Sequence, residues 1–167
     1  MKGKSIFAVA AMFCAAVCFS QDVVIKKPDY FTEPIRDGHV LFPDSLVYPA
    51  DAEEIVIPDV GTFGRLGNEF GDGYDFPNVR KIIFNNVDYV PGALINALPN
   101  LEEVVFNGMI GHFDCTLIMD CPKLKSIIFR GPVSSTGGSG LTSRVPSLEK
   151  IVFESVVVDL GVEPDSV

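Results

Sequence analysis

The sequence Pro77-Asn-Val-Arg-Lys-Ile-Ile-Phe84 recurs along the chain. It returns as Pro-Asn-Leu-Glu-Glu-Val-Val-Phe at residues 99–106, as Pro-Lys-Leu-Lys-Ser-Ile-Ile-Phe at 122–129 and as Pro-Ser-Leu-Glu-Lys-Ile-Val-Phe at 146–153. The successive steps are 22, 23 and 24 residues. A shorter copy without the proline, Ala-Glu-Glu-Ile-Val-Ile, occupies residues 52–57. Copies at such regular spacing indicate a repeat protein.

A second apolar group precedes each proline. Its members are Leu94, Leu117 and Leu141, five residues before the next proline, and Leu98, Cys121 and Val145, immediately before it. A single unit of this size cannot bury its own apolar face, so neighbouring units must stack and share one core. The sequence therefore predicts a repeat solenoid of about five units over residues 51–167.

The apolar end of each copy is expected to form a short β-strand. Alternate side chains of a strand point to opposite faces. The residues expected to point into the core are therefore Ile82, Val104, Ile127 and Ile151, together with Phe84, Phe106, Phe129 and Phe153. In stacked parallel strands, equivalent residues lie about 4.8 Å apart. One equivalent position reads Glu53, Arg80, Glu102, Lys125 and Glu149, and the next reads Glu54, Lys81, Glu103, Ser126 and Lys150. The first of these rows alternates in sign at every step, which favours in-register stacking because opposite charges attract across adjacent strands.

The residue between the two inward positions of each copy is expected to face outward. These residues form an apolar row of Val56, Ile83, Val105, Ile128 and Val152. To the same partner-binding face we assign Lys81, Glu103, Asn85, Asn107 and Arg130. Contiguous exposed apolar patches often mark interaction sites. Two alternatives stay open for the apolar row: β-branched residues favour strands in any case, and the N-terminal segment would hide the row if it folded over it.

The pattern Leu-x-x-[Ile/Val]-x-Phe with a period near 23 residues resembles the leucine-rich repeat. The cysteine before Pro122 and the leucine-containing return limb resemble its BspA-type bacterial cell-surface subclass. The resemblance covers about residues 50–160. It implies a solenoid with a parallel β-sheet on the concave face and irregular or short helical return limbs. It also implies a non-catalytic function, adhesion to or interaction with a host or cell-surface protein through that sheet.

The N-terminus has the features of a secretory signal peptide over residues 1–20. Lys2 and Lys4 precede an apolar run at residues 6–19, which is shorter than the roughly 20 residues of a membrane-spanning helix. We expect cleavage after Ser20, with lipid attachment at Cys18 as the alternative. The chain is therefore expected to be exported, as a secreted, periplasmic or cell-surface protein, and to have no transmembrane segment.

The two ends of the solenoid are expected to differ. Solenoids need capped ends, because terminal units otherwise expose their core. Residues 21–50 are the expected N-terminal cap, with extended pieces at 23–25 and 40–42 and a turn at Asp37-Gly38. After Phe153 the chain stays apolar through Val156-Val-Val158, and no polar cap is visible. A second function is therefore open, that of a self-associating structural component of the cell envelope.

The composition argues against several kinds of chemistry. A formal charge of -9, from 22 acidic against 13 basic residues, excludes most nucleic-acid binding, which needs clustered Lys and Arg. No catalytic motif is present, and neither His39 nor His112 has a companion at metal-ligand spacing. Cys115 and Cys121 share repeat positions with small or apolar residues, which favours core thiols over a disulfide. We therefore predict no enzyme activity, no metal site and no cofactor.

Overall fold

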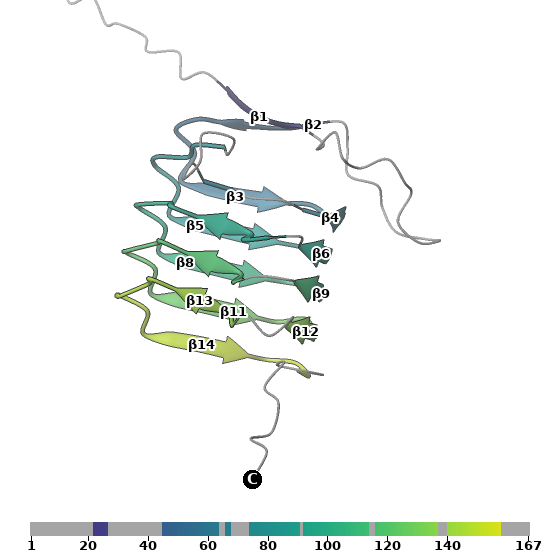
Figure 1. The fold of residues 1–167 in the computed structure, drawn as a ribbon. Helices are drawn as coiled ribbons and strands as arrows, with labels where there is room; N and C mark the ends of the chain where they lie inside the picture. The colour runs from purple at the N-terminus through teal and green to yellow at the C-terminus, as the bar shows by residue number, and fades with distance from the viewer. Residues whose placement is uncertain are drawn as a thin grey trace, which may run out of the picture.

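The chain forms a parallel β-solenoid of about four turns (Figure 1). The computed structural model describes residues 22–26, 45–63, 66–67, 74–90, 92–113, 116–136 and 140–157. All strand pairs within the stack are parallel, and every secondary-structure element of these residues is a strand. The predicted repeat solenoid is thus confirmed, with about four turns where about five units were predicted.

Each full turn contributes one strand to each of three sheets. The five-stranded sheet contains β3 (Glu54–Ile57), β5 (Lys81–Phe84), β8 (Glu103–Phe106), β11 (Ser126–Phe129) and β14 (Lys150–Phe153). The four-stranded sheet contains β4 (Val60–Thr62), β6 (Val87–Val90), β9 (Ile110–Phe113) and β12 (Val133–Thr136). The three-stranded sheet contains β7 (Ile95–Asn96), β10 (Ile118–Met119) and β13 (Thr142–Ser143). The register of the five-stranded sheet pairs the motif copies residue for residue, as their alignment predicts.

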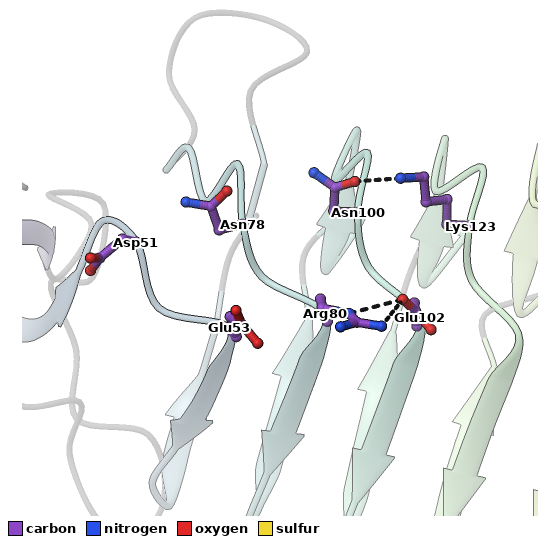
Figure 2. A pocket seen from close by; sticks show the side chains of 7 residues that line it. All are labelled: Asp51, Glu53, Asn78, Arg80, Asn100, Glu102 and Lys123. Carbon is purple, nitrogen blue, oxygen red and sulfur yellow. Dashed lines mark hydrogen bonds and ion pairs between the residues drawn. The ribbon is translucent and has the colours of Figure 1, made fainter.

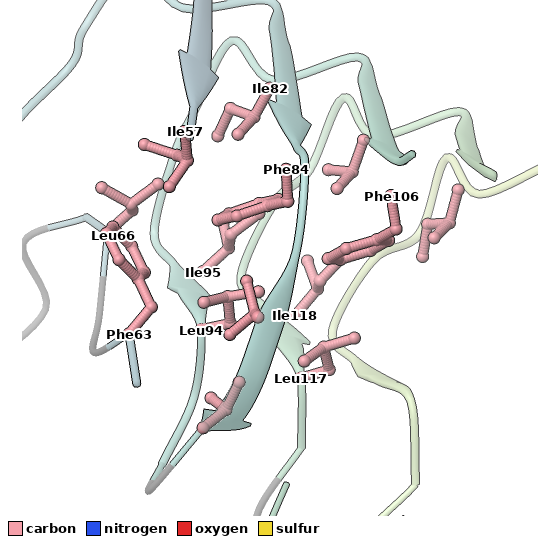
Figure 3. Packing of buried hydrophobic residues seen from close by; sticks show 14 of the residues in the cluster. Ile57, Phe63, Leu66, Ile82, Phe84, Leu94, Ile95, Phe106, Leu117 and Ile118 are labelled. Carbon is pink, nitrogen blue, oxygen red and sulfur yellow. The ribbon is translucent and has the colours of Figure 1, made fainter. Parts of the chain in front are cut away.

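The core runs along the axis of the stack as ladders of equivalent side chains (Figure 3). Phe84, Phe106, Phe129 and Phe153 stack in sequence, with ring centroids 5.2, 4.9 and 4.8 Å apart. The first three rings are buried as predicted, but Phe153, also predicted to point inward, is 37% exposed. The reason is its position in the last described turn, where no further ring covers its outer side. The second apolar group also joins the core, through Leu94, Leu98, Leu117 and Cys121.

The return limbs differ from those that the leucine-rich repeat implies. In the described part of the chain they are extended rather than irregular or helical, since β6 and β7 follow β5 and the same order recurs in the next two turns. The segments β6, β9 and β12 are rich in β-branched and aromatic residues, which lose side-chain freedom in a helix and suit a strand. Each of the three faces therefore advances by one strand spacing per turn.

A hairpin of β1 (Asp22–Lys26) and β2 (Ser45–Pro49) packs on the N-terminal end of the stack (Figure 1). The predicted extended piece at residues 23–25 is confirmed, but its partner is β2; residues 37–38 and 40–42 lie outside the described ranges. Ile25 is buried in the core, and the ring of Tyr48 meets that of Phe76 edge-on at 6.1 Å. The Tyr48 hydroxyl donates a hydrogen bond of 2.6 Å to the carbonyl of Val56 in β3. The hairpin thus packs over the outer side of β3 without pairing with it as a strand.

One corner of the turn has an unusual backbone. Ala97, Asp120 and Arg144, each two residues before the proline of its unit, have φ of 56°, 52° and 52°. Non-glycine residues adopt this left-handed conformation rarely and at a cost of about 1–2 kcal/mol. Its recurrence at one repeat position shows that the corner geometry is imposed by the stacking.

Candidate outward face of the five-stranded sheet

The candidate site is the surface of the five-stranded sheet that points away from the core, called here the outward face. Its charged row consists of Glu54, Lys81, Glu103, Ser126 and Lys150. Its apolar row consists of Val56, Ile83, Val105, Ile128 and Val152, and its polar row of Asn85, Asn107, Arg130 and Glu154. Of the ten residues assigned to the partner-binding face from the sequence, seven lie in strands of this sheet, and Asn85, Asn107 and Arg130 each directly follow one of its strands.

The apolar row is less open than its sequence suggests. Val56 is 44% exposed, whereas Ile83, Ile128 and Val152 are half-buried and Val105 is only 2% exposed. Val105 does not belong to the core cluster, so it is covered on the outside of the sheet rather than buried within it. It lies between the larger side chains of Ile83 and Ile128, one strand spacing away on each side. The apolar row is therefore unevenly exposed, and its central member is covered.

The charged row is joined by ion pairs along the stack. The ammonium Nζ of Lys81 lies 3.7 Å from Glu54 Oε2 and 3.2 Å from Glu103 Oε1. The hydroxyl of Ser126 donates to Glu103 Oε2 at 3.1 Å, and Ser126 is buried. These contacts fix side chains of neighbouring turns against one another, so this row has a defined shape.

The polar row is held by Arg130. One guanidinium nitrogen of Arg130 donates to Asn107 Oδ1 at 2.9 Å, and Arg130 Nε lies 3.8 Å from Glu154 Oε2. Asn107 and Arg130 are exposed and Asn85 is half-buried. Their planar amide and guanidinium groups present hydrogen-bonding edges beside the apolar row.

The outward face is electrically neutral. Its carboxylates are those of Glu54, Glu103 and Glu154, and its cations are Lys81, Arg130 and Lys150. Three charges of each sign contrast with the formal charge of -9 for the chain. Binding through apolar contacts removes water from the surface, and an excess of charge of one sign would oppose this. The neutral outward face with its central apolar row therefore suits apolar contact with a partner.

A polar depression with a volume of about 620 Å³ lies at the N-terminal ends of β3, β5, β8 and β11 (Figure 2). It is lined by Asp51, Glu53, Asn78, Arg80, Asn100, Glu102 and Lys123. The sequence predicts the alternating charges at Glu53, Arg80 and Glu102, but it does not predict the depression. The signal that could have indicated it is the polar residue after each proline, which places Asn78, Asn100 and Lys123 in a second row above the charges.

The contacts within the depression tie adjacent turns together. Arg80 donates through Nε and a terminal nitrogen to Glu102 Oε1 at 2.9 and 2.6 Å, and Lys125 Nζ donates to Glu102 Oε2 at 2.8 Å. The hydrogen bonds from Lys125 and then Arg80 lower the pKa of the Glu102 carboxyl. Lys123 Nζ donates to Asn100 Oδ1 at 2.7 Å. The predicted attraction between opposite charges of neighbouring turns is thus confirmed for Glu102. The polar groups of the depression therefore pair with one another across turns.

Other reactive groups of the chain lie away from the outward face. Cys121 is a free, buried thiol that contacts the carbonyl of Met119, and burial raises its pKa to about 11, so it is protonated and unreactive at neutral pH. His112 is exposed and stacks on Tyr89 at 5.9 Å. Cys115, His39 and the Asp114 near His112 lie outside the described residues.

Metal-binding and membrane-spanning features are absent from the part of the chain that the structure describes. Those residues contain no group of three or more His, Cys, Asp or Glu side chains placed to hold a metal ion. They also contain no helix with the length and apolar character needed to cross a membrane. No family model, no curated protein and no solved structure matches the chain.

Proposed function

We propose that this chain is an exported, non-catalytic leucine-rich repeat protein of the BspA type that binds a protein partner through the outward face. The observation that carries the proposal is the neutral, apolar-centred outward face on a strongly acidic chain. A protein partner suits it best, because an apolar row flanked by fixed hydrogen-bonding groups resembles the apolar centre and polar rim of protein–protein interfaces.

Export is part of the same proposal. The basic and apolar segment at residues 1–20 supports it, with cleavage after Ser20 and lipid attachment at Cys18 as the competing outcome. Mass spectrometry of the mature N-terminus distinguishes them, since a chain that begins at Gln21 supports cleavage and a diacylglycerol on Cys18 supports lipidation. A chain that keeps Met1 and its following residues would contradict both.

The binding proposal is tested by a charge placed in the apolar row. The double variant Ile83→Lys, Ile128→Lys puts two ammonium groups in the row while leaving the inward side chains unchanged. The matched control is Val47→Lys, Val156→Lys, which adds the same charge at two exposed positions away from the outward face, one on the hairpin and one after β14. Proteins captured from surface extracts by the wild type and the control, but lost from the Ile83→Lys, Ile128→Lys variant, are the expected result. Identical captured sets for all three proteins would contradict the proposal.

A second candidate function, self-association as a structural component of the cell envelope, is favoured by the last described turn. Phe153 is 37% exposed and Val156 68% exposed, so apolar surface is open at that end of the stack. This candidate uses the edge of the sheet rather than its face, and the two functions are therefore separable.

A further inference from the structure

The C-terminal edge of the five-stranded sheet is formed by β14. The amides of Lys150 and Glu154 donate to the carbonyls of Lys125 and Phe129 on the β11 side, at 3.2 and 2.7 Å. Alternate residues of a strand direct their N–H and C=O groups to opposite sides. Ile151 and Phe153 therefore direct theirs away from β11, where no other strand of the described residues lies.

The side chains at this edge continue the core ladders. Phe153 stacks on Phe129 at 4.8 Å and is itself 37% exposed, and Ile151 is half-buried. A strand with unpaired backbone groups and an apolar inner surface is a template for another strand.

The opposite edge of the same sheet is covered by the hairpin, although the hairpin does not pair with β3 as a strand. The Tyr48 hydroxyl donates a hydrogen bond to the Val56 carbonyl of β3. Head-to-tail stacking of copies, which would produce filaments, would have to displace the hairpin from this end. Pairing of two identical edges about a twofold axis instead gives a closed dimer.

The charges on β14 select one register for such a pair. With the axis at Val152, Lys150 lies opposite Glu154 of the second copy and Ile151 lies opposite Phe153. An axis at Ile151 would place the charged Glu149 opposite the inward Phe153, and an axis at Phe153 would place Ser155 opposite Ile151. The Val152 register alone matches opposite charges and keeps apolar side chains together on the core side.

The backbone pattern agrees with this register. Antiparallel strands alternate between residue pairs that exchange two hydrogen bonds and pairs that exchange none. The groups directed at the free edge belong to Ile151 and Phe153, which face each other across the Val152 axis. The pairs without hydrogen bonds, Val152 with Val152 and Lys150 with Glu154, have the more closely spaced side chains.

We propose that two copies of this chain pair β14 with β14, antiparallel about a twofold axis at Val152, to join their five-stranded sheets into one continuous sheet. The inference rests on the second candidate function, self-association, and specifies its geometry. It also places two outward faces side by side on one surface.

Charge exchange tests the register. Lys150→Glu and Glu154→Lys each place like charges opposite each other twice in the dimer, and each is expected to weaken dimerisation by roughly tenfold or more. All charge variants are made in an Arg130→Gln background, because Arg130 pairs with Glu154 within one chain. There the double variant Lys150→Glu, Glu154→Lys is expected to restore dimerisation to within about threefold of its Arg130→Gln parent, because the pair between the two chains is rebuilt with its signs exchanged. Glu149→Lys is the matched control, since Ser155 of the second copy carries no charge. The measurement is sedimentation equilibrium over a concentration series, with circular dichroism to verify that each variant is folded.

A disulfide tests the position of the axis. Val152→Cys is expected to form a covalent dimer on mild oxidation, because opposite residues without hydrogen bonds approach closely enough for a disulfide. Glu149→Cys is the control that should stay uncrosslinked. A chain that is monomeric at every concentration overturns the inference. In that case the edge of β14 would be left to residues 158–167 of the same chain or to another protein. A dimer in which the charge exchange fails to rescue also overturns it. Neither result affects the binding proposal, which is assayed separately at Ile83 and Ile128.

Discussion

Phe106 shows at the residue scale what holds the solenoid together. Its ring is 1% exposed and lies between Phe84 and Phe129, nearly parallel to both at interplanar angles of 14° and 6°. Removal of one inner ring therefore removes contacts with two turns at once. The terminal Phe153 contacts the ladder on one side only.

Phe106→Ala is expected to lower the free energy of unfolding by about 3–5 kcal/mol, the range for a buried phenylalanine that leaves a cavity. Phe153→Ala is the matched control, and its expected cost is about 1–2 kcal/mol because part of the ring is already in water. Urea unfolding followed by circular dichroism measures both. Equal losses of unfolding free energy in the two variants would contradict the conclusion that an inner ring stabilises the stack through two turns at once.

Glu102 makes stability depend on pH. Hydrogen bonds from Lys125 and Arg80 lower its pKa below the ordinary value of 4.5, so the folded chain binds this proton less readily than the unfolded chain. The corresponding stabilisation is complete above pH 4.5 and is lost as the pH falls through the lower folded-state value. Asp120 contributes in the same direction, because a hydrogen bond from Arg144 lowers its pKa.

Glu102→Gln is therefore expected to reduce the fall in unfolding free energy between neutral pH and about pH 3. Glu149→Gln is the control, since the Glu149 carboxylate has no side-chain partner within the described part of the chain. Urea unfolding at several pH values measures the difference. A pH dependence of Glu102→Gln that equals the wild-type dependence would exclude this role for Glu102.

At the scale of the elements, the left-handed backbone at the corner before each proline is unfavourable for the non-glycine residues found there. Ala97 has φ of 56°, a conformation that glycine adopts without steric cost. Ala97→Gly is expected to stabilise the chain by about 0.5 kcal/mol, the relief of strain less the greater entropy of the unfolded chain. The nearby Ala93→Gly, where φ is not positive, is expected to destabilise it by about 1 kcal/mol. Thermal unfolding measures both, and a loss of stability in both variants would exclude strain at the corner.

The sequence specifies some elements better than others. The strands of the five-stranded sheet were predictable because each ends in a run of three apolar residues, rich in β-branched side chains, that recurs in register. The strands β7, β10 and β13 were not, because each has two residues and becomes a strand only when equivalent segments stack. The burial of Val105 depends on its neighbours across the sheet rather than on its own copy. The left-handed corner was not predictable, because alanine and arginine, which occupy it at Ala97 and Arg144, rarely adopt a left-handed backbone.

At the scale of the whole molecule, the two ends differ in the support that they receive. The hairpin covers the first turn, whereas β14 has a strand partner on one side only among the described residues. In a solenoid each turn is stabilised chiefly by its neighbours, so opening begins at the less supported end. At concentrations where the chain is monomeric, the amides of Lys150 and Glu154 are expected to exchange hydrogen about tenfold or more faster than those of β8. Mass-spectrometric hydrogen exchange measures this, and uniform exchange along the stack would contradict it.

The unequal steps between prolines have a consequence for how such a chain can lengthen. Steps of 22, 23 and 24 residues produce the same strand register, so the extra residues are taken up at the corners and leave the rungs of the sheet unchanged. Duplication of one unit would add one rung, about 4.8 Å of height and one more residue to each row of the outward face. The repeat therefore works as a molecular ruler, in which gene duplication sets the length of the surface without requiring a new fold.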